Sequence, residues 1–381
     1  MKFVIAPDSY KGSLSSAEAG EIIARAIGQE IPGSKTRVIP MADGGEGTVE
    51  ALLAAAGGEK VRVRAAGPLG DATETFYGII ERDGERTAVI EAANICGITM
   101  VPPELRNPLR TTTRGIGEVI RDALYRGIRS FVIGLGGSAT NDGGLGMLSA
   151  LGARFSSCDG RVLYGFGHEL ADVARAEVEG LDPRISGCRI TIACDVTNPL
   201  LGENGATYVY GPQKGAGREE LELLERTMAA YADAAEASFA CVCRDMPGAG
   251  AAGGLGFACM LLGGSVVSGA QMIEQMTGLS HHIEDADWII TGEGRSDHQT
   301  LYGKLPIHVA RIAKALGKPV ILISGSLGPG SERLSESFTA CFATVRGPAS
   351  LEECMREAGS NLYACARQVA RLIHHSLHAT L

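Results

Sequence analysis

The sequence has no apolar run long enough to cross a membrane, because a spanning helix needs about 20 predominantly apolar residues. It also has no excess of positive charge: 35 Lys and Arg stand against 44 Asp and Glu, giving a net charge of −9. Nucleic acid and membrane are therefore not expected as partners. The first residues lack the apolar core and the small-residue cleavage site of a signal peptide. Together these absences predict a cytoplasmic protein.

The cysteines lack metal-binding spacing. None of the ten lies in a C-x-x-C pair, and the nearest two, Cys241 and Cys243, are separated by one residue. A zinc cluster is therefore disfavoured against reduced cysteines in apolar strands and helices. Aromatic residues make up only 5%, whereas there are 52 glycines. These glycines fall between periodic segments, which predicts tight turns rather than disorder.

Three common catalytic motifs are also missing. No G-x-x-x-x-G-K-[ST] occurs, because Lys304 is followed by Leu305 and Lys318 by Pro319. Neither the G-x-S-x-G of α/β-hydrolases nor the H-E-x-x-H of metalloproteases is present. The sequence therefore excludes the P-loop mechanism and these two hydrolytic classes at the level of motifs.

Short apolar segments alternate with helical patterns at both ends of the chain, which predicts a parallel α/β sheet. The expected strands cover residues 2–6, 35–39, 288–290, 319–323 and 340–345. The expected helices cover residues 15–29, 47–56, 306–316 and 351–378. We therefore expect one doubly wound domain, built from residues 1–60 and 284–381. Residues 61–283 form a second, inserted α/β domain, with a hairpin at 74–90 that turns at Asp83 and Gly84.

Polar motifs follow the expected strands, at the edge where open parallel sheets bind ligands. After the first strand, Ser9 and Lys11 can hold an oxyanion in front of the first helix. An ordinary loop with a helix cap explains the same residues equally well. After the second strand, Asp43 lies among glycines and is a candidate acceptor for a substrate hydroxyl or a metal-bound water.

A glycine-rich segment follows the expected strand at residue 131. Gly134, Gly136 and Ala139 formally satisfy the dinucleotide-binding fingerprint, but the acid expected about twenty residues later is not clearly present. The polar residues from 138 to 142 instead suggest a turn suited to a metal or a phosphate. Both interpretations stay open from the residues alone.

Further candidates lie later in the middle of the chain. Asp195 and Asn198 end an expected strand, where such a pair can hold a divalent cation or position a hydroxyl. The alternative is a turn before Pro199, in which Asp and Asn are common. Lys214 stands in Gly-Pro-Gln-Lys-Gly, and residues 250–256 predict another loop of nearly bare backbone.

The most informative segment is residues 291–304, between an expected strand and an expected helix. It places two acids, Glu293 and Asp297, close to two bases, Arg295 and Lys304. A solvated loop does not need this combination. It suits a site that holds a phosphate and a metal ion.

Together, six segments resemble the bacterial type I glycerate kinases, and they occur in the order found in that family. The segments are residues 6–13, 42–47, 136–144, 194–199, 211–215 and 291–304. The resemblance implies ATP-dependent, Mg²⁺-assisted phosphorylation of D-glycerate, usually giving 2-phosphoglycerate. It also implies a flavodoxin-like domain that carries a second, inserted α/β domain.

The chemistry of phosphoryl transfer suggests roles for these residues, because the reaction requires positioning, charge neutralisation and a proton acceptor. Ser9, Lys11 and Arg295 are candidates for the glycerate carboxylate. Asp195 and Asp297 are candidates for the base and for a metal ligand, in an order that the sequence leaves open.

Other candidates complete the expected site. Asn198 and Glu293 are further metal-ligand candidates, Asp43 is a substrate contact, and Lys11 is also counted among the catalytic residues. The groups expected to hold the ATP phosphates are two lysines, glycine backbone and two polar side chains: Lys214, Lys304, Gly136, Gly137, Gly253, Gly254, Ser138 and Asn141. The expected active site is the cleft between the two domains.

Several alternatives remain at this stage. The kinase could phosphorylate the 3-hydroxyl and form 3-phosphoglycerate. A NAD(P)-dependent dehydrogenase would instead use the glycines at 134–139. A non-catalytic two-domain solute binder would have a similar α/β organisation. Monomer and homodimer both stay open.

Overall fold

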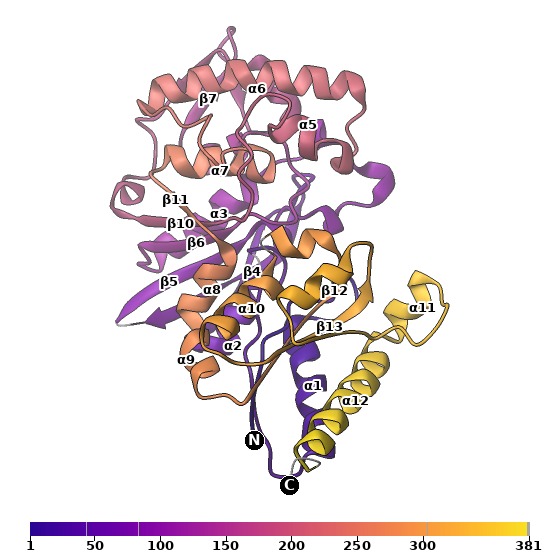
Figure 1. Ribbon diagram of the computed structural model, residues 1–381. Coiled ribbons are helices and arrows are strands. Elements are labelled where there is room, and N and C mark those ends of the chain that lie inside the picture. Colours follow the sequence, from indigo (N-terminus) through magenta and orange to yellow (C-terminus); the bar gives the residue numbers. More distant parts are fainter. Residues whose placement is uncertain (43, 83, 303, 379–381) are drawn as a thin grey trace. The chain divides into compact units, whose positions relative to one another are not determined.

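The computed structural model describes residues 1–42, 44–82, 84–302 and 304–378 (Figure 1). The chain forms two compact units. Unit 1 comprises Met1–Asp43, Glu50–Ala56 and Ala270–Leu381, and unit 2 comprises Gly44–Val49 and Gly57–Gly269. Unit 1 therefore contains residues from both ends of the chain. The domain limits expected from the sequence, at residues 60 and 284, stay predictions.

Unit 1 contains a five-stranded, all-parallel sheet with the order β14-β13-β12-β1-β2. The strands are β1 (Lys2–Ile5), β2 (Lys35–Val38), β12 (Trp288–Ser296), β13 (Val320–Leu327) and β14 (Ala340–Ala343). Counted along the chain within this unit, the order is 2-1-3-4-5, which is the flavodoxin-like order. The strand β1 pairs with β12 so that Phe3 lies opposite Trp288.

The helices that lie wholly or largely in unit 1 are α1 (Ser16–Glu30), α2 (Thr48–Ala56), α8 (Gly269–Thr277), α9 (Leu279–Glu284), α10 (Leu305–Ala315), α11 (Leu351–Arg356) and α12 (Ala358–His378). Of these, α1, α10 and α12 pack on the strands of the sheet. A capping box between Ser15 and Glu18 begins α1. Helices α1 and α12 lie side by side (Figure 1) and bury Ile23 and Val369 in one core. The single helix expected at 351–378 is wrong, because Glu357 separates α11 from α12.

Unit 2 contains a six-stranded sheet with the order β11-β10-β6-β5-β4-β3. Its strands are β3 (Glu59–Ala66), β4 (Ala72–Arg82), β5 (Glu85–Glu91), β6 (Ser130–Gly134), β10 (Arg189–Ala193) and β11 (Ser265–Val267). The pairs formed by β3, β4 and β5 among themselves are antiparallel, and the other pairs are parallel. The hairpin expected at 74–90 is confirmed as β4 and β5, although Asp83 at its turn lies outside the described residues.

A small sheet and further helices complete unit 2. The small sheet has the order β8-β7-β9, with β7 (Arg154–Ser156), β8 (Val162–Leu163) and β9 (Arg175–Glu177). The helices are α3 (Arg114–Tyr125), α4 (Leu145–Ala150), α5 (Ala206–Tyr210), α6 (Arg218–Phe239) and α7 (Ala251–Leu261). The rings of Phe155, Tyr231 and Phe257 pack together in the core. The α/β class with parallel pairing is thus confirmed in both units.

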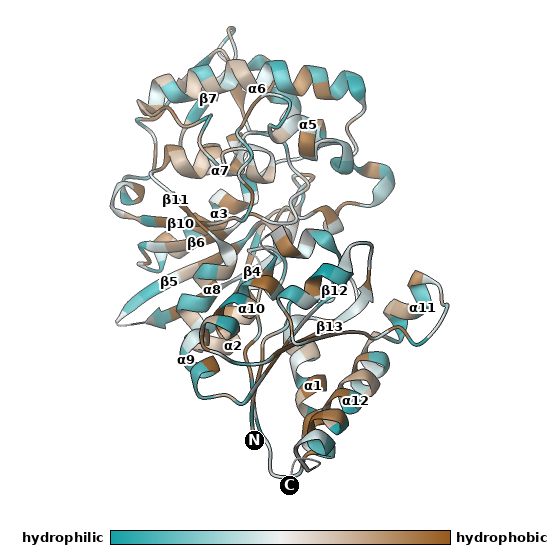
Figure 2. Cartoon of the chain, viewed as in Figure 1, coloured by the Kyte–Doolittle hydropathy of each residue, from teal (hydrophilic) through white to brown (hydrophobic). Residues whose placement is uncertain are grey.

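Hydropathy follows the helical period. Hydrophilic and hydrophobic residues alternate along α6 and α12 (Figure 2), as expected for helices with one face in a core. In the part of the chain that the structure describes, no helix is long and apolar enough to span a bilayer. All ten cysteines are free thiols, and several of them, including Cys96 and Cys259, are buried in the core of unit 2.

Candidate functional site

The carboxyl ends of β1 and β12 bring the first polar motif beside the segment at 291–304. The backbone N–H of Asp8 donates to the carbonyl of Gly292 at 2.8 Å. The phenol of Tyr10 donates to the carbonyl of Ile323 at 2.6 Å. A Cβ on Gly294 would lie 3.4 Å from the backbone nitrogen of Lys11. The loop that carries Ser9 and Lys11 is therefore a neighbour of the segment that carries Glu293.

The strand β12 is longer than the sequence predicts. Residues 288–290 are expected as strand and the polar residues as a connection, but β12 continues to Ser296. Its neighbour β13 extends equally far, so that Arg295 lies opposite Ser326 and the ladder continues. Glu293 and Arg295 are therefore strand residues. Their backbone is held by the sheet rather than by a solvated loop.

The carboxylate of Glu293 organises the edge of this sheet. Its Oε1 accepts from the hydroxyls of Ser296 at 2.8 Å and Thr300 at 2.7 Å. Its Oε2 lies 3.4 Å from the ammonium of Lys304, which precedes α10. The hydroxyl of Ser296 also lies 2.6 Å from that of Ser324 on β13. Because the protein's own groups contact both of its oxygens, Glu293 is better placed to orient Lys304 than to serve as an open metal ligand.

Arg295 and Asp297 are more accessible. The Arg295 side chain is 64% exposed, and its Nε lies 3.7 Å from Oδ2 of Asp297. The Asp297 side chain is 15% exposed. A Cβ on Gly328 would lie 3.1 Å from Cβ of Asp297 and 3.2 Å from Nε of Arg295, so the glycine lets the loop after β13 approach both. A largely exposed guanidinium beside a carboxylate can receive an anionic substrate.

Tyr10 is a residue of this edge that the sequence analysis does not single out. It is 3% exposed. Burial, and then the neighbouring Cys365, Glu293 and Asp8, raise the pKa of its phenol. The phenol therefore stays protonated and fixes the loop after β1 to β13. Only the assembly of the sheet creates this contact, so no local sequence signal reveals it.

In unit 2, two glycine-rich segments cross in direct contact. The backbone N–H of Gly136 donates to the carbonyl of Gly44 at 3.2 Å. A Cβ on Gly136 would lie 2.6 Å from Cα of Gly45, and one on Gly134 would lie 2.5 Å from the Gly44 carbonyl oxygen. The side of Gly134 and Gly136 that a dinucleotide would have to approach is thus covered by the protein's own backbone. This arrangement argues against the dehydrogenase alternative.

The glycines at 250–256 lie at the start of α7, where a kink interrupts the helix. Gly253 and Gly254 have non-helical backbone there, with φ of +69° and +90°. A Cβ on Gly253 would lie 2.0 Å from the carbonyl oxygen of Thr140, and one on Gly254 would lie 2.6 Å from Cα of Gly143. The close packing and the positive φ account for both glycines without a ligand.

Lys214 lies against the turn at residues 137–141, in which Gly137 has φ of +76°. Its ammonium donates to Oγ of Ser138 at 3.1 Å and to the carbonyl of Thr140 at 2.7 Å. The residue is 3% exposed, and burial lowers the pKa of its ammonium to about 8. Because Oγ of Ser138 accepts from Lys214, the hydroxyl proton is directed elsewhere and can donate to an anion.

Asn141 of this turn and the adjacent Asp142 are fully buried. Asn141 donates through Nδ2 to Oγ1 of Thr207 at 3.1 Å, whereas its Oδ1 has no hydrogen-bond partner among the described residues. Asp142 accepts from the backbone N–H and hydroxyl of Thr113, both at 2.8 Å, and from the N–H of Gly144 at 3.1 Å. Burial raises the pKa of Asp142, which acts as a structural acceptor before α4.

The strand-end pair Asp195 and Asn198 is tied to other parts of the chain. Oδ1 of Asp195 accepts from the hydroxyl of Ser268 at 2.7 Å and the N–H of Gly269 at 3.1 Å, where α8 begins. Oδ1 of Asn198 accepts from the hydroxyl of Tyr210 at 2.6 Å, and its Nδ2 donates to the carbonyl of Asn204 at 2.8 Å. The contacts of Asn198 favour the turn interpretation, whereas the exposed Asp195 keeps access to solvent.

Glu91 is a second residue that the sequence analysis misses. It ends β5, is 2% exposed, and accepts from the N–H groups of Gly47 at 3.3 Å and Val49. Gly47 is the last residue before α2, and Val49 lies in its first turn. An acid that ends an apolar run, as Asp195 does, is the signal that could have revealed it.

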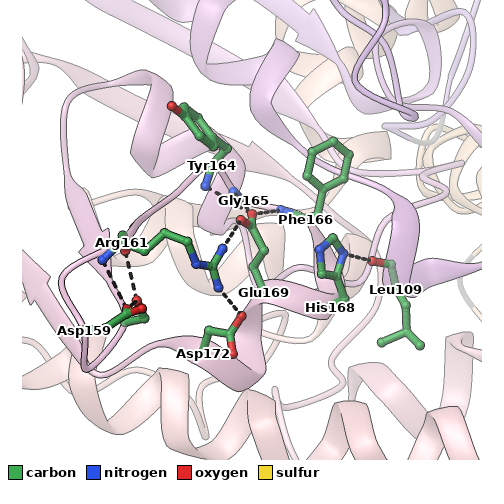
Figure 3. Close-up of polar contacts among 10 residues, drawn as sticks. Leu109, Asp159, Arg161, Tyr164, Gly165, Phe166, His168, Glu169 and Asp172 are labelled. Atoms are coloured by element: carbon green, nitrogen blue, oxygen red, sulfur yellow. Dashed lines mark hydrogen bonds and ion pairs between the residues drawn. The ribbon is translucent and has the colours of Figure 1, made fainter.

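Glu169 of unit 2 accepts from backbone N–H groups in the same way as Glu91, in a segment outside these motifs. Figure 3 shows its carboxylate accepting from the backbone N–H groups of Tyr164, Gly165 and Phe166, at 3.1, 2.7 and 3.0 Å. Arg161 lies 3.7 Å from the same carboxylate. Buried carboxylates that satisfy backbone N–H groups are therefore a recurrent structural element of this unit.

The expected metal ligands divide between the units. Asp195 and Asn198 belong to unit 2, and Glu293 and Asp297 belong to unit 1. Within the described ranges, no three His, Cys, Asp or Glu side chains form a ready-made metal cluster. Asp43, the expected substrate contact, lies outside the described residues.

Known proteins resemble the chain over nearly its whole length. The sequence profile of the Glycerate kinase family matches residues 3–374. A glycerate kinase of Halalkalibacterium halodurans is 45% identical, covering 96% of this chain and 97% of the relative. A glycerate 2-kinase of Escherichia coli is 43% identical, covering 97% of each chain. A crystal structure described as putative glycerate kinase 2 from Salmonella typhimurium LT2 superposes with a TM-score of 0.86 at 43% identity, covering 99% of each chain.

The flavodoxin-like sheet, its charged edge and these relatives define a phosphotransferase of the α/β class. More narrowly, the chain belongs to the glycerate kinase family. The resemblance seen in the six sequence segments is thereby confirmed.

Proposed function

We propose that this protein transfers the γ-phosphoryl group of ATP to the 2-hydroxyl of D-glycerate, giving 2-phosphoglycerate and ADP. The observation that carries the proposal is the cluster of charged groups at the edge of the unit 1 sheet, in a member of the glycerate kinase family. The name of the Escherichia coli relative, a glycerate 2-kinase, supports the 2-hydroxyl over the 3-hydroxyl.

The carboxylate of glycerate needs a cation and hydrogen-bond donors. Arg295 is largely exposed and only loosely paired with Asp297, so its planar guanidinium can bind a carboxylate through two hydrogen bonds. Ser9 and Lys11 lie in the loop beside this strand and are the further contacts that we propose. This arrangement recognises a small hydroxy acid through its charge.

The phosphates of ATP need positive charge that is held in place. Lys304 is 39% exposed and is oriented by the buried Glu293, which leaves its ammonium accessible. We propose Lys304 as a phosphate contact in unit 1, and Ser138, oriented by Lys214, as a donor in unit 2. The backbone of Gly137 is proposed to assist. That the substrates meet between the two units stays a prediction from the sequence.

The residues also suit Mg²⁺, which is usually bound through one or two carboxylates together with substrate phosphates and water. The carboxylates of Asp195 and Asp297, both in contact with solvent, are hard oxygen donors of this kind. When bound, Mg²⁺ would neutralise charge on the phosphates. We propose that one of these two aspartates binds Mg²⁺ and the other accepts the proton of the glycerate hydroxyl.

The proposed activity is tested by ADP release that requires both ATP and D-glycerate, with Mg²⁺ present. Phosphorus NMR of the product distinguishes 2-phosphoglycerate from 3-phosphoglycerate. Release of ADP that does not depend on glycerate would contradict the proposal.

Two variants separate the roles of the aspartates. Replacing the base, by Asp195→Asn or Asp297→Asn, is expected to lower kcat about 10²–10⁴-fold at saturating Mg²⁺. Replacing the metal ligand is expected chiefly to raise the Mg²⁺ concentration needed for half-maximal rate. Asp245→Asn, at an exposed position of unit 2, is the matched control and should leave both quantities unchanged.

A further inference from the structure

The amino-terminal parts of β1 and β2 border a cavity, away from the carboxyl ends that carry the charged site. Residues 2–4 of β1, 35–37 of β2 and several residues of 281–286 around the end of α9 line a volume of about 710 Å³. A neighbouring hollow of about 420 Å³ shares Thr36, Arg37 and His282 with it. The two hollows continue one another along β2, which is an edge strand of the sheet. Small-molecule sites commonly occupy about 300–1,000 Å³.

The lining carries more positive than negative charge. Its cations are Lys2, Lys35 and Arg37, and its acids are Glu284 and Asp285. Lys2 and Asp285 neutralise one another, because their charged atoms lie 2.6 Å apart. Among the residues that the structure describes, neither Lys35 nor Arg37 forms an ion pair. Two exposed cations therefore face Glu284 in this cavity, and Glu21 lines the neighbouring hollow that shares Arg37, in a chain whose net charge is −9.

Two histidines also line this cavity, and they do not add to its positive charge. The rings of His281 and His282 lie 5.9 Å apart, and both residues line the cavity. Burial, followed by the charges of Arg37 and His281, lowers the pKa of His282. His282 therefore favours its neutral form beside Arg37, which leaves the arginine and Lys35 as the charges available to an anion.

We propose that this cavity binds a small, multiply charged anion of the phosphate-ester class, with Arg37 as its principal contact and Lys35 as the second. An arginine fork matches the oxygens of a phosphate group, and Lys35 supplies a point charge beside it. Because the proposed reaction uses the carboxyl ends of the same strands, an anion here leaves the kinase site open and binds together with the substrates.

The fluorescence of Trp288 can report binding in this cavity. Trp288 is its one tryptophan, and it lies directly opposite the cavity residue Phe3 in the sheet. Titration with inorganic pyrophosphate at constant ionic strength should therefore change the fluorescence of Trp288 in a saturable way. Calorimetry under the same conditions supplies an independent measure of the same binding.

Variants assign the binding to this cavity. Arg37→Gln is expected to weaken pyrophosphate binding by about tenfold or more, and Lys35→Gln by less. Arg86→Gln, at an exposed position of unit 2, is the matched control and should not change it. Lys304→Met removes a proposed phosphate contact at the kinase site and should leave the Trp288 signal intact.

Three results would overturn the proposal: no saturable signal, a signal that survives in the double variant of Arg37 and Lys35, or a signal lost with Lys304→Met. Circular dichroism and kinase activity without pyrophosphate show whether Arg37→Gln still folds. The binding measurement does not depend on turnover, so its failure is distinguishable from failure of the proposed kinase function.

Discussion

The two large sheets differ in how their carboxyl edges are formed. In unit 1, side chains do the positioning: Glu293 binds two hydroxyls and the ammonium of Lys304. In unit 2, backbone packs on backbone, because Gly136 crosses the segment at 44–45 with no room for a side chain. The charged edge depends on electrostatics and the glycine edge on steric fit. Removing a charge should therefore perturb the first edge most, and adding one methyl group should perturb the second.

The largest expected effect on stability is at the glycine crossing. Gly136→Ala places a Cβ 2.6 Å from Cα of Gly45, which is backbone that cannot rotate away. We expect a loss of unfolding free energy of about 3 kcal/mol, at the upper end of overpacking effects. Chemical denaturation followed by circular dichroism measures it. The matched control is Gly28→Ala in α1, where nothing lies within 4 Å and a gain of about 0.5–1 kcal/mol is expected.

The next largest effect on stability is expected at Glu293, in the charged edge of unit 1. Glu293→Gln keeps the size of the side chain but replaces one accepting oxygen by an NH₂ group and removes the charge that faces Lys304. Loss of a hydrogen-bonded buried charge should lower the unfolding free energy by about 2 kcal/mol. Denaturation measures stability, and the KM for ATP reports whether Lys304 has lost its orientation. Unchanged values of both would contradict the role assigned to Glu293.

A pH profile tests the lysine that supports the glycine edge. The pKa of Lys214 is lowered to about 8, so its positive charge is present below that pH and is lost as the pH rises through it. The charged fraction falls about tenfold between pH 7 and pH 9. If Lys214 and Ser138 assist phosphate binding, kcat/KM for ATP should fall by up to that factor. The profile of Lys214→Arg should stay level over this range, provided that circular dichroism shows it folded.

The smallest effect on stability is expected at Lys304. Its ion pair with Glu293 is long, at 3.4 Å, and the lysine is 39% exposed, so solvent weakens the interaction. Lys304→Met should change the unfolding free energy by less than about 1 kcal/mol while raising the KM for ATP. A large loss of stability with an unchanged KM would show that Lys304 is structural, which would remove the proposed difference between the edges.

Much of the fold follows from local sequence pattern. Apolar segments with helices between them predict a parallel sheet, and the motifs that follow β1 and β12 do converge at one edge. The expected end of β12 is wrong, because pairing with β13 rather than local composition extends it to Ser296. Tyr10 and Glu91 are missed for a related reason. Each acts on a segment distant in sequence, and such contacts exist only after the sheets form.

The glycines show a second limit of prediction from the sequence. The sequence predicts that Gly136 and Gly253 offer bare backbone to ATP phosphates, because glycine-rich turns often have that use. The structure accounts for both through contacts within unit 2, at Gly45 and Thr140. A sequence shows that a side chain is absent but not which neighbour requires its absence. The assignment of these two glycines to ATP binding stays a prediction.

The position of β1 inside its sheet has a consequence for synthesis of the protein. Lys2 hydrogen-bonds to Asp287 across 285 positions, so β1 must await a partner from the last third of the chain. A ribosome adding roughly 5–20 residues per second delivers β12 roughly 15–60 s after β1. Every residue of unit 2 has been translated by then. The apolar residues Phe3 to Ile5 of β1 therefore lack their β12 partner for most of translation, which leaves an unpaired strand edge prone to aggregation.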